Sequence, residues 1–141
     1  MKAILLMTCL CVILACTKEE PRSEWETFDF TTFSLEAPST WKPFTSQGYD
    51  SKVGGVTNGK DTLFYDYGMY SNRFTTETSQ THVITEIDRQ GYPTRMVKPK
   101  KPGNGVIGIY YNLGNTFRLT LYGRSANEKT FVQILESVRI K

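Results

Sequence analysis

The sequence predicts an α+β domain in which an antiparallel β-sheet of about six strands packs against one C-terminal α-helix. Between residues 28 and 123, short runs alternate apolar and polar residues, which is the pattern of half-buried strands. Turn sequences rich in Gly, Asn and Pro separate these runs, as is typical of antiparallel hairpins. Only the segment after residue 125 places apolar residues at helical spacing.

The first expected strand, residues 33–36, alternates apolar and polar side chains before Ala37 and Pro38 end it. Two hairpins follow it, each made of two alternating runs around a turn. In the first, the strands are residues 52–56 and 62–70 and the turn is at Asn58-Gly59. In the second, the strands are residues 81–89 and 94–98 and the turn is at Gly91-Tyr92-Pro93. Asn-Gly is the strongest short hairpin signal, so we expect a two-residue turn at the first of them.

A third hairpin joins residues 106–112 to residues 116–123. A three-residue loop of Leu113, Gly114 and Asn115 pairs Asn112 with Thr116 and gathers the apolar side chains on one face, namely Ile107, Ile109, Tyr111, Phe117, Leu119 and Leu121. A two-residue loop would mix apolar and polar residues on both faces, because a one-residue slip inverts every side chain. We therefore expect the three-residue loop, with Asn115 in the left-handed conformation that Asn tolerates.

One helix is expected near the C-terminus. Ser125 or Asn127 can cap it, and Glu128 lies in its first turn. Its apolar residues recur at helical spacing, at Phe131, Ile134, Leu135 and Val138. We expect the helix to end near Ser137 and residues 138–140 to form a closing strand.

The N-terminal residues have the layout of a secretory signal. Lys2 gives a positive start, residues 3–14 are almost all apolar, and Ala15 precedes Cys16. An apolar run of about 12 residues spans roughly 18 Å as a helix, too short for a hydrocarbon core of about 30 Å. Residues 13–16 resemble the bacterial lipoprotein lipobox, in which the Cys16 thiol would receive a diacylglycerol and become the mature N-terminus. A cleaved signal without lipid is the alternative, but it leaves Cys16 unexplained.

This layout predicts a lipoprotein signal peptide at residues 1–15, a polar tether at residues 16–27 and a single α+β domain at residues 28–141. Cys9 and Cys11 leave with the signal, so with Cys16 acylated the domain has no thiol for a disulfide or a metal. We expect no metal and no cofactor. The formal net charge of the whole chain is only +3, which does not argue for a nucleic-acid partner.

Two segments carry a family resemblance. Residues 33–38 (Phe-Ser-Leu-Glu-Ala-Pro) followed by Trp41-Lys42 resemble the first strand of Mog1/PsbP-like domains, and residues 134–140 resemble that family's closing helix and strand. Members of the family act as accessory or binding proteins, so the resemblance implies a non-enzymatic role.

Other stretches resemble small lipoproteins of the Bacteroidota, at residues 48–55 and 66–71. Residues 17–20 (Thr-Lys-Glu-Glu) resemble the short stretch of Lys and acidic residues that marks surface-exported lipoproteins of that group. Thr17 is also not Asp, the residue that tends to retain enterobacterial lipoproteins at the inner membrane. We therefore expect lipid anchoring in the bacterial envelope, at the outer membrane and with surface exposure. A solvated charged tether is the plainer interpretation of residues 17–20.

No catalytic constellation is evident. His82 is the only histidine, and hydrolytic triads or zinc sites need further partners. Asp61 and Asp66 are five residues apart, so on one extended strand they point to opposite faces. We predict no catalytic residue and interpret His82 as a packing or surface residue.

The best candidate for a binding face is the polar side of the third hairpin. Tyr110, Arg118 and Tyr122 offer a flat amphipathic surface, a cation–π partner and donors suited to sugars or peptide carboxylates. The solvated face of an ordinary antiparallel sheet would have the same composition. We therefore expect a non-catalytic accessory or ligand-binding module with an envelope protein or glycan partner. The alternative is a hydrolase acting on envelope material through residues that the sequence does not identify.

Overall fold

The computed structural model describes residues 24–141. The expected signal peptide at residues 1–15 and the expected lipidation site Cys16 lie outside the described residues. Within residues 24–141 there are ten strands and one helix: β1 (Trp25–Phe30), β2 (Phe33–Pro38), β3 (Lys42–Gln47), β4 (Lys52–Thr57), β5 (Thr62–Gly68), β6 (His82–Arg89), β7 (Tyr92–Pro99), β8 (Ile107–Asn112), β9 (Arg118–Gly123), α1 (Glu128–Glu136) and β10 (Arg139–Ile140).

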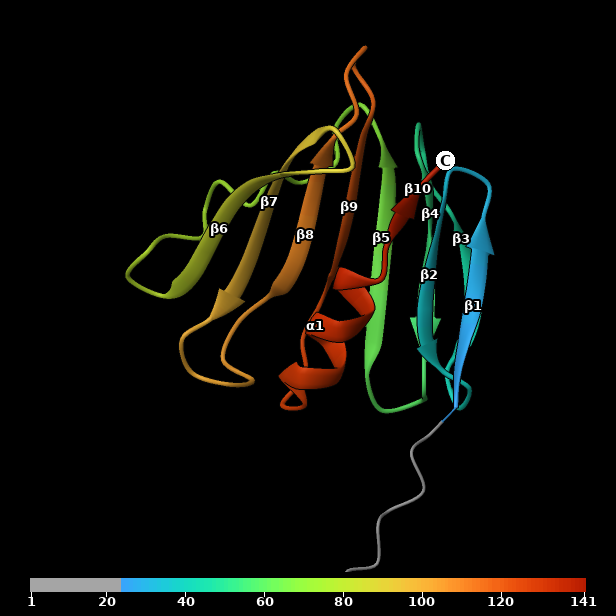
Figure 1. The fold of residues 1–141 in the computed structure, drawn as a ribbon, viewed down its shortest axis with the longest axis horizontal. Coiled ribbons are helices and arrows are strands. Elements are labelled where there is room, and N and C mark those ends of the chain that lie inside the picture. The colour runs from blue at the N-terminus through green and yellow to red at the C-terminus, as the bar shows by residue number, and fades with distance from the viewer. Residues whose placement is uncertain (1–23) are drawn as a thin grey trace, which may run out of the picture.

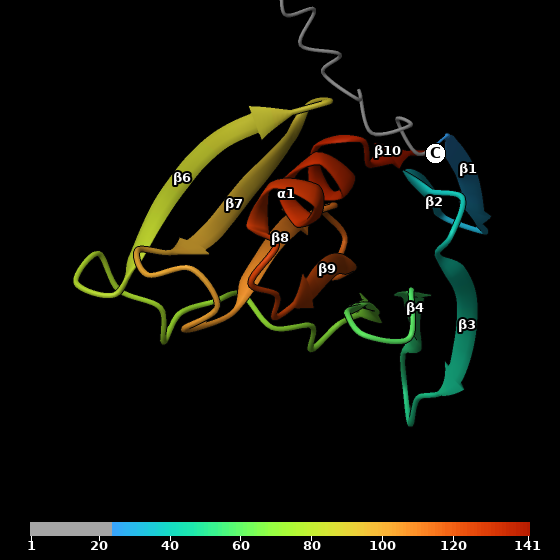
Figure 2. The same cartoon turned by 90° about the horizontal axis from the view of Figure 1, so that it is seen from below.

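The strands form two antiparallel sheets. The larger has seven strands in the order β3-β4-β5-β9-β8-β7-β6, and the smaller has the order β1-β2-β10. Figure 1 shows the large sheet with α1 lying across it. Figure 2 shows that this sheet is curved and that α1 and the small sheet lie on its concave side.

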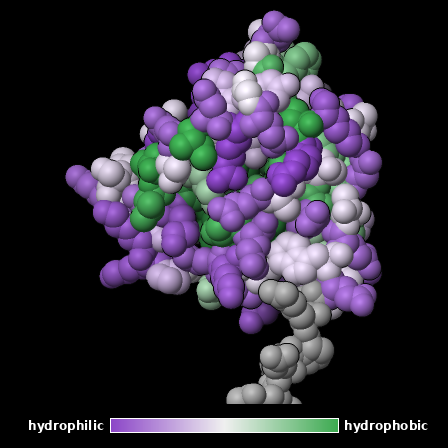
Figure 3. All heavy atoms as spheres, in the orientation of Figure 1, coloured by the Kyte–Doolittle hydropathy of each residue, from purple (hydrophilic) through white to green (hydrophobic). Residues whose placement is uncertain are grey.

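The core fills the space between the concave face and the elements that cover it. Its buried side chains come from both sheets and from α1, and they include Phe33, Leu35, Trp41, Val56, Leu63, Ile107, Ile109, Tyr111, Leu119, Leu121, Phe131, Ile134, Leu135 and Val138. Each large apolar side chain buried in this way contributes about 1.5–3 kcal/mol. Figure 3 shows the molecule from the side that carries α1. The surface there is largely hydrophilic, with apolar side chains gathered toward the edge where β6 lies.

The helix forms as the sequence predicts. The Asn127 side chain accepts from the backbone N–H of Thr130, which satisfies a donor of the first turn. Trp41 meets Phe131 edge to face, with ring centroids 5.8 Å apart. At the other end, the Ser137 hydroxyl donates to the Ile134 carbonyl and accepts from the Glu36 backbone N–H at 2.8 Å. These contacts fix α1 to β2, and β10 closes the small sheet as expected.

The expected class of a mainly antiparallel α+β domain is confirmed, but about six strands in one sheet was wrong. Strand β3 was missed because Phe44 is its only large apolar residue and follows Pro43, so the segment shows no alternation. Strand β1 was missed because most of its side chains are exposed. It begins at Trp25, so residues 25–27 belong to the domain rather than to the expected tether of residues 16–27.

The expected hairpins are present, but their turns differ. Asn112 pairs with Arg118 rather than with Thr116, so the strands of the third hairpin are shifted by two residues. A shift of two keeps every side chain on its face, which is why the predicted apolar face still holds, except that Phe117 lies outside the strand and is 46% exposed. Asn115 has the predicted left-handed conformation, with φ of 46°.

The other two turns also depart from the prediction. Thr57 pairs with Thr62, so the Asn58-Gly59 hairpin has a four-residue loop rather than a two-residue turn. The Asn58 side chain accepts from the backbone N–H groups of Lys60 and Asp61, which stabilises the longer loop. The β6–β7 turn lies one residue earlier than expected: Arg89 pairs with Tyr92, which leaves a two-residue turn at positions 90 and 91.

Candidate functional site

The convex face of the large sheet is crossed by the β5–β6 connection, residues 69–81 (Figure 2). The Thr120 hydroxyl donates to the Asn72 carbonyl at 2.8 Å, which joins β9 to this connection. Phe74 is 1% exposed and packs on Gly108, where a Cβ atom would lie 2.2 Å from the Phe74 ring. A glycine is therefore required at position 108 for the connection to pack against the sheet.

This connection corrects the expected binding face. Thr120 lies at the centre of the expected face and is fully buried beneath the connection. The polar side of the third hairpin is therefore not an open, solvated surface. Tyr110 is only 8% exposed and lies on one side of the connection. The Arg118 guanidinium donates to the Met69 carbonyl and lies in a separate hollow, and Tyr122 borders a third. The structure therefore does not bring Tyr110, Arg118 and Tyr122 together in one site.

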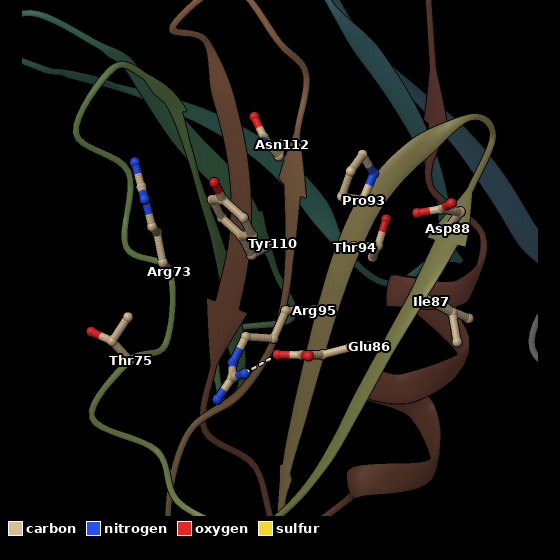
Figure 4. A pocket seen from close by; sticks show the side chains of 10 residues that line it. All are labelled: Arg73, Thr75, Glu86, Ile87, Asp88, Pro93, Thr94, Arg95, Tyr110 and Asn112. Carbon is tan, nitrogen blue, oxygen red and sulfur yellow. Dashed lines mark hydrogen bonds and ion pairs between the residues drawn. The ribbon is translucent and has the colours of Figure 1, made fainter.

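A large hollow in the described part of the chain lies between the connection and strands β6, β7 and β8. We call it the convex groove. It has a volume of about 780 Å³, and its lining residues are Arg73, Thr75, Glu86, Ile87, Asp88, Pro93, Thr94, Arg95, Tyr110 and Asn112. Figure 4 shows Arg73 and Thr75 on the connection and the other labelled residues on the strands, with Ile87 directed toward α1.

Sheet register places the floor of the convex groove. Glu86 pairs with Arg95, and Arg95 pairs in turn with Tyr110, so these three side chains are neighbours across β6, β7 and β8. Asp88 lies two residues along β6 from Glu86, which puts both carboxylates on the same face. Arg73 stands on the opposite wall, on the connection that Phe74 fixes to the sheet.

The two arginines of the groove differ in their bonding. Arg95 forms an ion pair with Glu86, and its Nη2 donates to the Glu77 carbonyl at 3.4 Å. Its Nε is buried and has no acceptor within residues 24–141. Among the same residues, no hydrogen bond or ion pair involves the Arg73 side chain. A guanidinium carries five N–H donors in a planar fork, so the groove has unused donor capacity on its floor, at Arg95, and on its wall, at Arg73.

Asp66 and Tyr122 form a second polar feature of the convex face. Asp66 pairs with Thr120 across β5 and β9, and its Oδ1 is buried without a partner in the described structure. Burial raises the pKa of the Tyr122 hydroxyl, and the negative charge of Asp66 raises it further. Tyr122 also stacks on Phe64, with ring centroids 5.7 Å apart.

The remaining residues considered in the sequence lie away from the groove. His82 is 8% exposed, and its Nδ1 is 2.9 Å from the Thr81 hydroxyl, which agrees with a packing role. Asp61 lies in the β4–β5 loop and Asp66 on β5, and neither lines the convex groove. Residues 24–141 contain no group of three His, Cys, Asp or Glu residues that could hold a metal ion.

Sequence reasoning missed most of the groove. The Glu86–Arg95 pair follows from a hairpin centred on Gln90 and Gly91, so a correct turn would have revealed it. No signal in the sequence indicates that Arg73 lies opposite this pair, because the connection that carries it has no regular secondary structure.

The comparisons with known proteins supply no relative: no protein-family model matches the chain, and no curated protein matches it. No helix within residues 24–141 is long and apolar enough to cross a membrane.

Proposed function

We propose that this protein is a non-catalytic, lipid-anchored binding module of the bacterial cell envelope, and that its convex groove binds a glycan that carries a carboxylate. The observation that carries this proposal is the Arg73 guanidinium, which has no partner among residues 24–141 and lies on the wall of an open groove of about 780 Å³ whose floor includes Arg95.

The chemistry of the lining favours an acidic sugar. A guanidinium binds a carboxylate through two parallel hydrogen bonds, and Arg73 has no competing partner among the described residues. The hydroxyls of Thr75 and Tyr110 and the amide of Asn112 can both donate to and accept from sugar hydroxyls. Glu86 and Asp88 add acceptors on the floor, so the groove offers a hydroxyl-rich ligand partners on every side.

The N-terminal sequence supports the location. Two acyl chains on Cys16 would contribute on the order of 20 kcal/mol of membrane attachment, at about 0.8 kcal/mol for each methylene. The domain begins at β1, so the chain between Cys16 and Trp25 can reach about 25–30 Å when extended. The domain would therefore act close to the membrane surface, at the outer membrane if residues 17–20 act as an export signal.

The anchor has a direct test. A Cys16→Ser variant should move from the membrane fraction to the soluble fraction, because the substitution removes the thiol that receives the lipid. If the variant still sediments with membranes in detergent-free fractionation, the anchor lies elsewhere in the chain.

We propose further that the domain is related to Mog1/PsbP-like domains. The strand that carries the resemblance is β2, whose Phe33 and Leu35 lie in the core beside Trp41, and the chain closes with a helix followed by a short strand. A lipoprotein of the Bacteroidota type with an accessory or binding role is the function this relationship implies.

A hydrolase remains the second candidate because of one observation. Glu86 and Asp88 are two residues apart on one face of β6, so their Cα atoms are separated by about 7 Å. Glycoside hydrolases use two carboxylates whose carboxyl groups, rather than their Cα atoms, lie about 5–10 Å apart on either side of the scissile bond. Asp88→Asn would abolish cleavage of a bound glycan if the pair were catalytic, whereas our proposal predicts no cleavage by either protein.

Binding tests the ligand class. The detergent-solubilised lipoprotein should bind oligogalacturonate and lose at least about tenfold in affinity with Arg73→Gln, the loss expected for a charged hydrogen-bond pair. Arg124→Gln is the matched control, because Arg124 lies at a different hollow of the same face. Equal affinity for the carboxyl-reduced oligosaccharide would rule out the carboxylate as the recognised group.

A further inference from the structure

The outer side of β6 is an unpaired edge of the large sheet. Gln90 and Gly91, between β6 and β7, have φ of 55° and 81°, the pattern of a type I′ turn, so the Arg89–Tyr92 pair exchanges both of its hydrogen bonds. Because such pairs alternate along an antiparallel ladder, the backbone groups of Ile84, Glu86 and Asp88 point away from β7.

The prolines of β7 agree with this pattern. Pro93 lies opposite Asp88 and Pro99 opposite His82, at positions where β7 need not donate to β6. The His82 backbone N–H is already bound by the Thr78 carbonyl at 2.8 Å. The free backbone groups of the edge are therefore those of Ile84, Glu86 and Asp88.

The two edges of the large sheet differ in how they are protected. The β3 edge carries Lys42 and Pro43, and both residue types discourage pairing with another strand. Strand β6 has eight residues in unbroken register with β7 and contains neither lysine nor proline. Val83 and Ile87 are 50% and 45% exposed, on the side where Figure 3 shows apolar side chains gathered.

We propose that β6 pairs antiparallel with β6 of a second copy of this chain, centred on Thr85, and joins the two large sheets into one. This register places Val83 opposite Ile87, Ile84 opposite Glu86 and His82 opposite Asp88. The concave side of the seam is then a row of β-branched residues from both copies, which pack well as cross-strand pairs. The Ile84–Glu86 pairs form the hydrogen bonds, because the backbone groups of both residues point outward.

Neighbouring registers are less favourable. A seam centred on Glu86 places two like charges directly opposite one another, which destabilises a cross-strand pair. A seam centred on Ile84 takes Ile87 beyond the start of the opposing strand. Shifts of one residue put side chains on the wrong faces. The strand is therefore self-complementary in one register.

The two-fold axis of this dimer is compatible with a lipid anchor on each copy. The axis runs normal to the joined sheet, so both copies keep the same side toward the membrane. The small sheet, which includes β1, lies on the concave side (Figure 2). Both tethers then start from the membrane side and both convex grooves face away from it. Confinement to a membrane raises the effective concentration, which favours so small an interface.

The seam also reaches the groove. Glu86 and Asp88 lie on its floor, so Ile84 and His82 of the second copy would extend its rim. This inference does not depend on the ligand, because the pairing rests on the β6 edge alone.

Disulfide cross-linking tests the dimer. Thr85 lies opposite itself in a pair that exchanges no hydrogen bonds, where Cα atoms are about 4.5 Å apart, within the range that a disulfide spans. In the acylated protein, residues 17–141 contain no cysteine, so the thiol introduced by Thr85→Cys is the only free one there. Mild oxidation in membranes should give a covalent dimer, and the matched variant Thr45→Cys on the β3 edge should not.

A second variant keeps the test specific. Val83→Lys, added to Thr85→Cys, places a charge opposite Ile87 and should lower the yield of dimer at least about fivefold. Its effect on folding should be small, because Val83 is half exposed. The proposal is overturned if Thr85→Cys dimerises no more than Thr45→Cys, if Val83→Lys leaves the yield unchanged, or if Thr85→Cys cross-links to a different protein instead.

Discussion

The two faces of the large sheet are closed in different ways. The concave face is covered by α1 and the small sheet, and its side chains are fully buried apolar residues such as Ile109 and Leu121. Among residues 24–141, the β5–β6 connection is what covers the convex face, and it is held by Phe74 and by polar contacts such as that between Thr120 and Asn72.

This difference separates stability from binding. Apolar packing on the concave face supplies most of the stability of the domain. The hollows on that side, of about 330 and 160 Å³, are smaller than the convex groove. The single connection on the convex face leaves hollows on both of its sides, and it brings Arg73 to the wall of the convex groove. The polar side of the β8–β9 hairpin is therefore the side on which the β5–β6 connection packs and the convex groove forms.

The largest expected effect is on the concave face. Leu119→Ala should lower the free energy of unfolding by about 2–5 kcal/mol, because Leu119 is fully buried and the truncation leaves a cavity. Urea unfolding followed by circular dichroism measures this loss. Asn112→Ala, an exposed position on the convex side of β8, should change the stability by no more than about 0.5 kcal/mol. Similar losses in the two variants would mean that the faces are not divided as described.

A smaller effect is expected where the connection meets the sheet. Gly108→Ala should cost about 1–3 kcal/mol, because the new methyl group would collide with the Phe74 ring. The displaced connection should also be cleaved faster by trypsin after Arg73. Gly114→Ala is the control: Gly114 has φ of 74° and no neighbour within 4 Å, so the substitution strains the backbone without moving the connection. Cleavage that is unchanged in Gly108→Ala would show that Phe74 does not hold the connection in place.

The smallest expected effect concerns ionisation on the convex face. Burial and then the charge of Asp66 raise the pKa of Tyr122 above its usual 10.0, so Asp66→Asn should lower it. Because the pKa of Tyr122 is higher in the folded state than in the unfolded state, its neutral hydroxyl stabilises the fold at pH values below the unfolded-state pKa. This contribution is lost as the pH rises through the folded-state pKa. NMR titration of the Tyr122 ring carbon between pH 9 and 12 measures the change. An unchanged or higher pKa in Asp66→Asn would contradict the proximity of the two groups.

The sequence predicts those parts of the fold that alternation and capping control. The helix was correctly placed because Asn127 caps it and because Phe131, Ile134 and Leu135 recur at helical spacing. The apolar face of the third hairpin was also correct, since the register error of two residues preserves the side on which each residue lies.

The parts that depend on tertiary contacts could not be predicted. Strand β3 forms because it pairs with β4, although Phe44 is the only large apolar residue in it. The buried state of Thr120 depends on a connection that begins about 50 residues earlier in the chain, and nothing in the local pattern indicates it. Tyr110, one of the residues of the expected binding face, lines the convex groove, but its neighbours Arg73 and Arg95 come from elements that only the fold brings together.

The most direct test of the account is whether the convex groove holds a carboxylate. In the ¹⁵N spectrum of the detergent-solubilised lipoprotein, the Nε–Hε signals of Arg73 and Arg95 should shift and saturate as oligogalacturonate is added, while that of Arg124 should stay in place. The carboxyl-reduced oligosaccharide should leave all three signals unchanged. Shifts confined to Arg124, or equal shifts with both oligosaccharides, would contradict the assignment of this groove as the binding site for an acidic glycan.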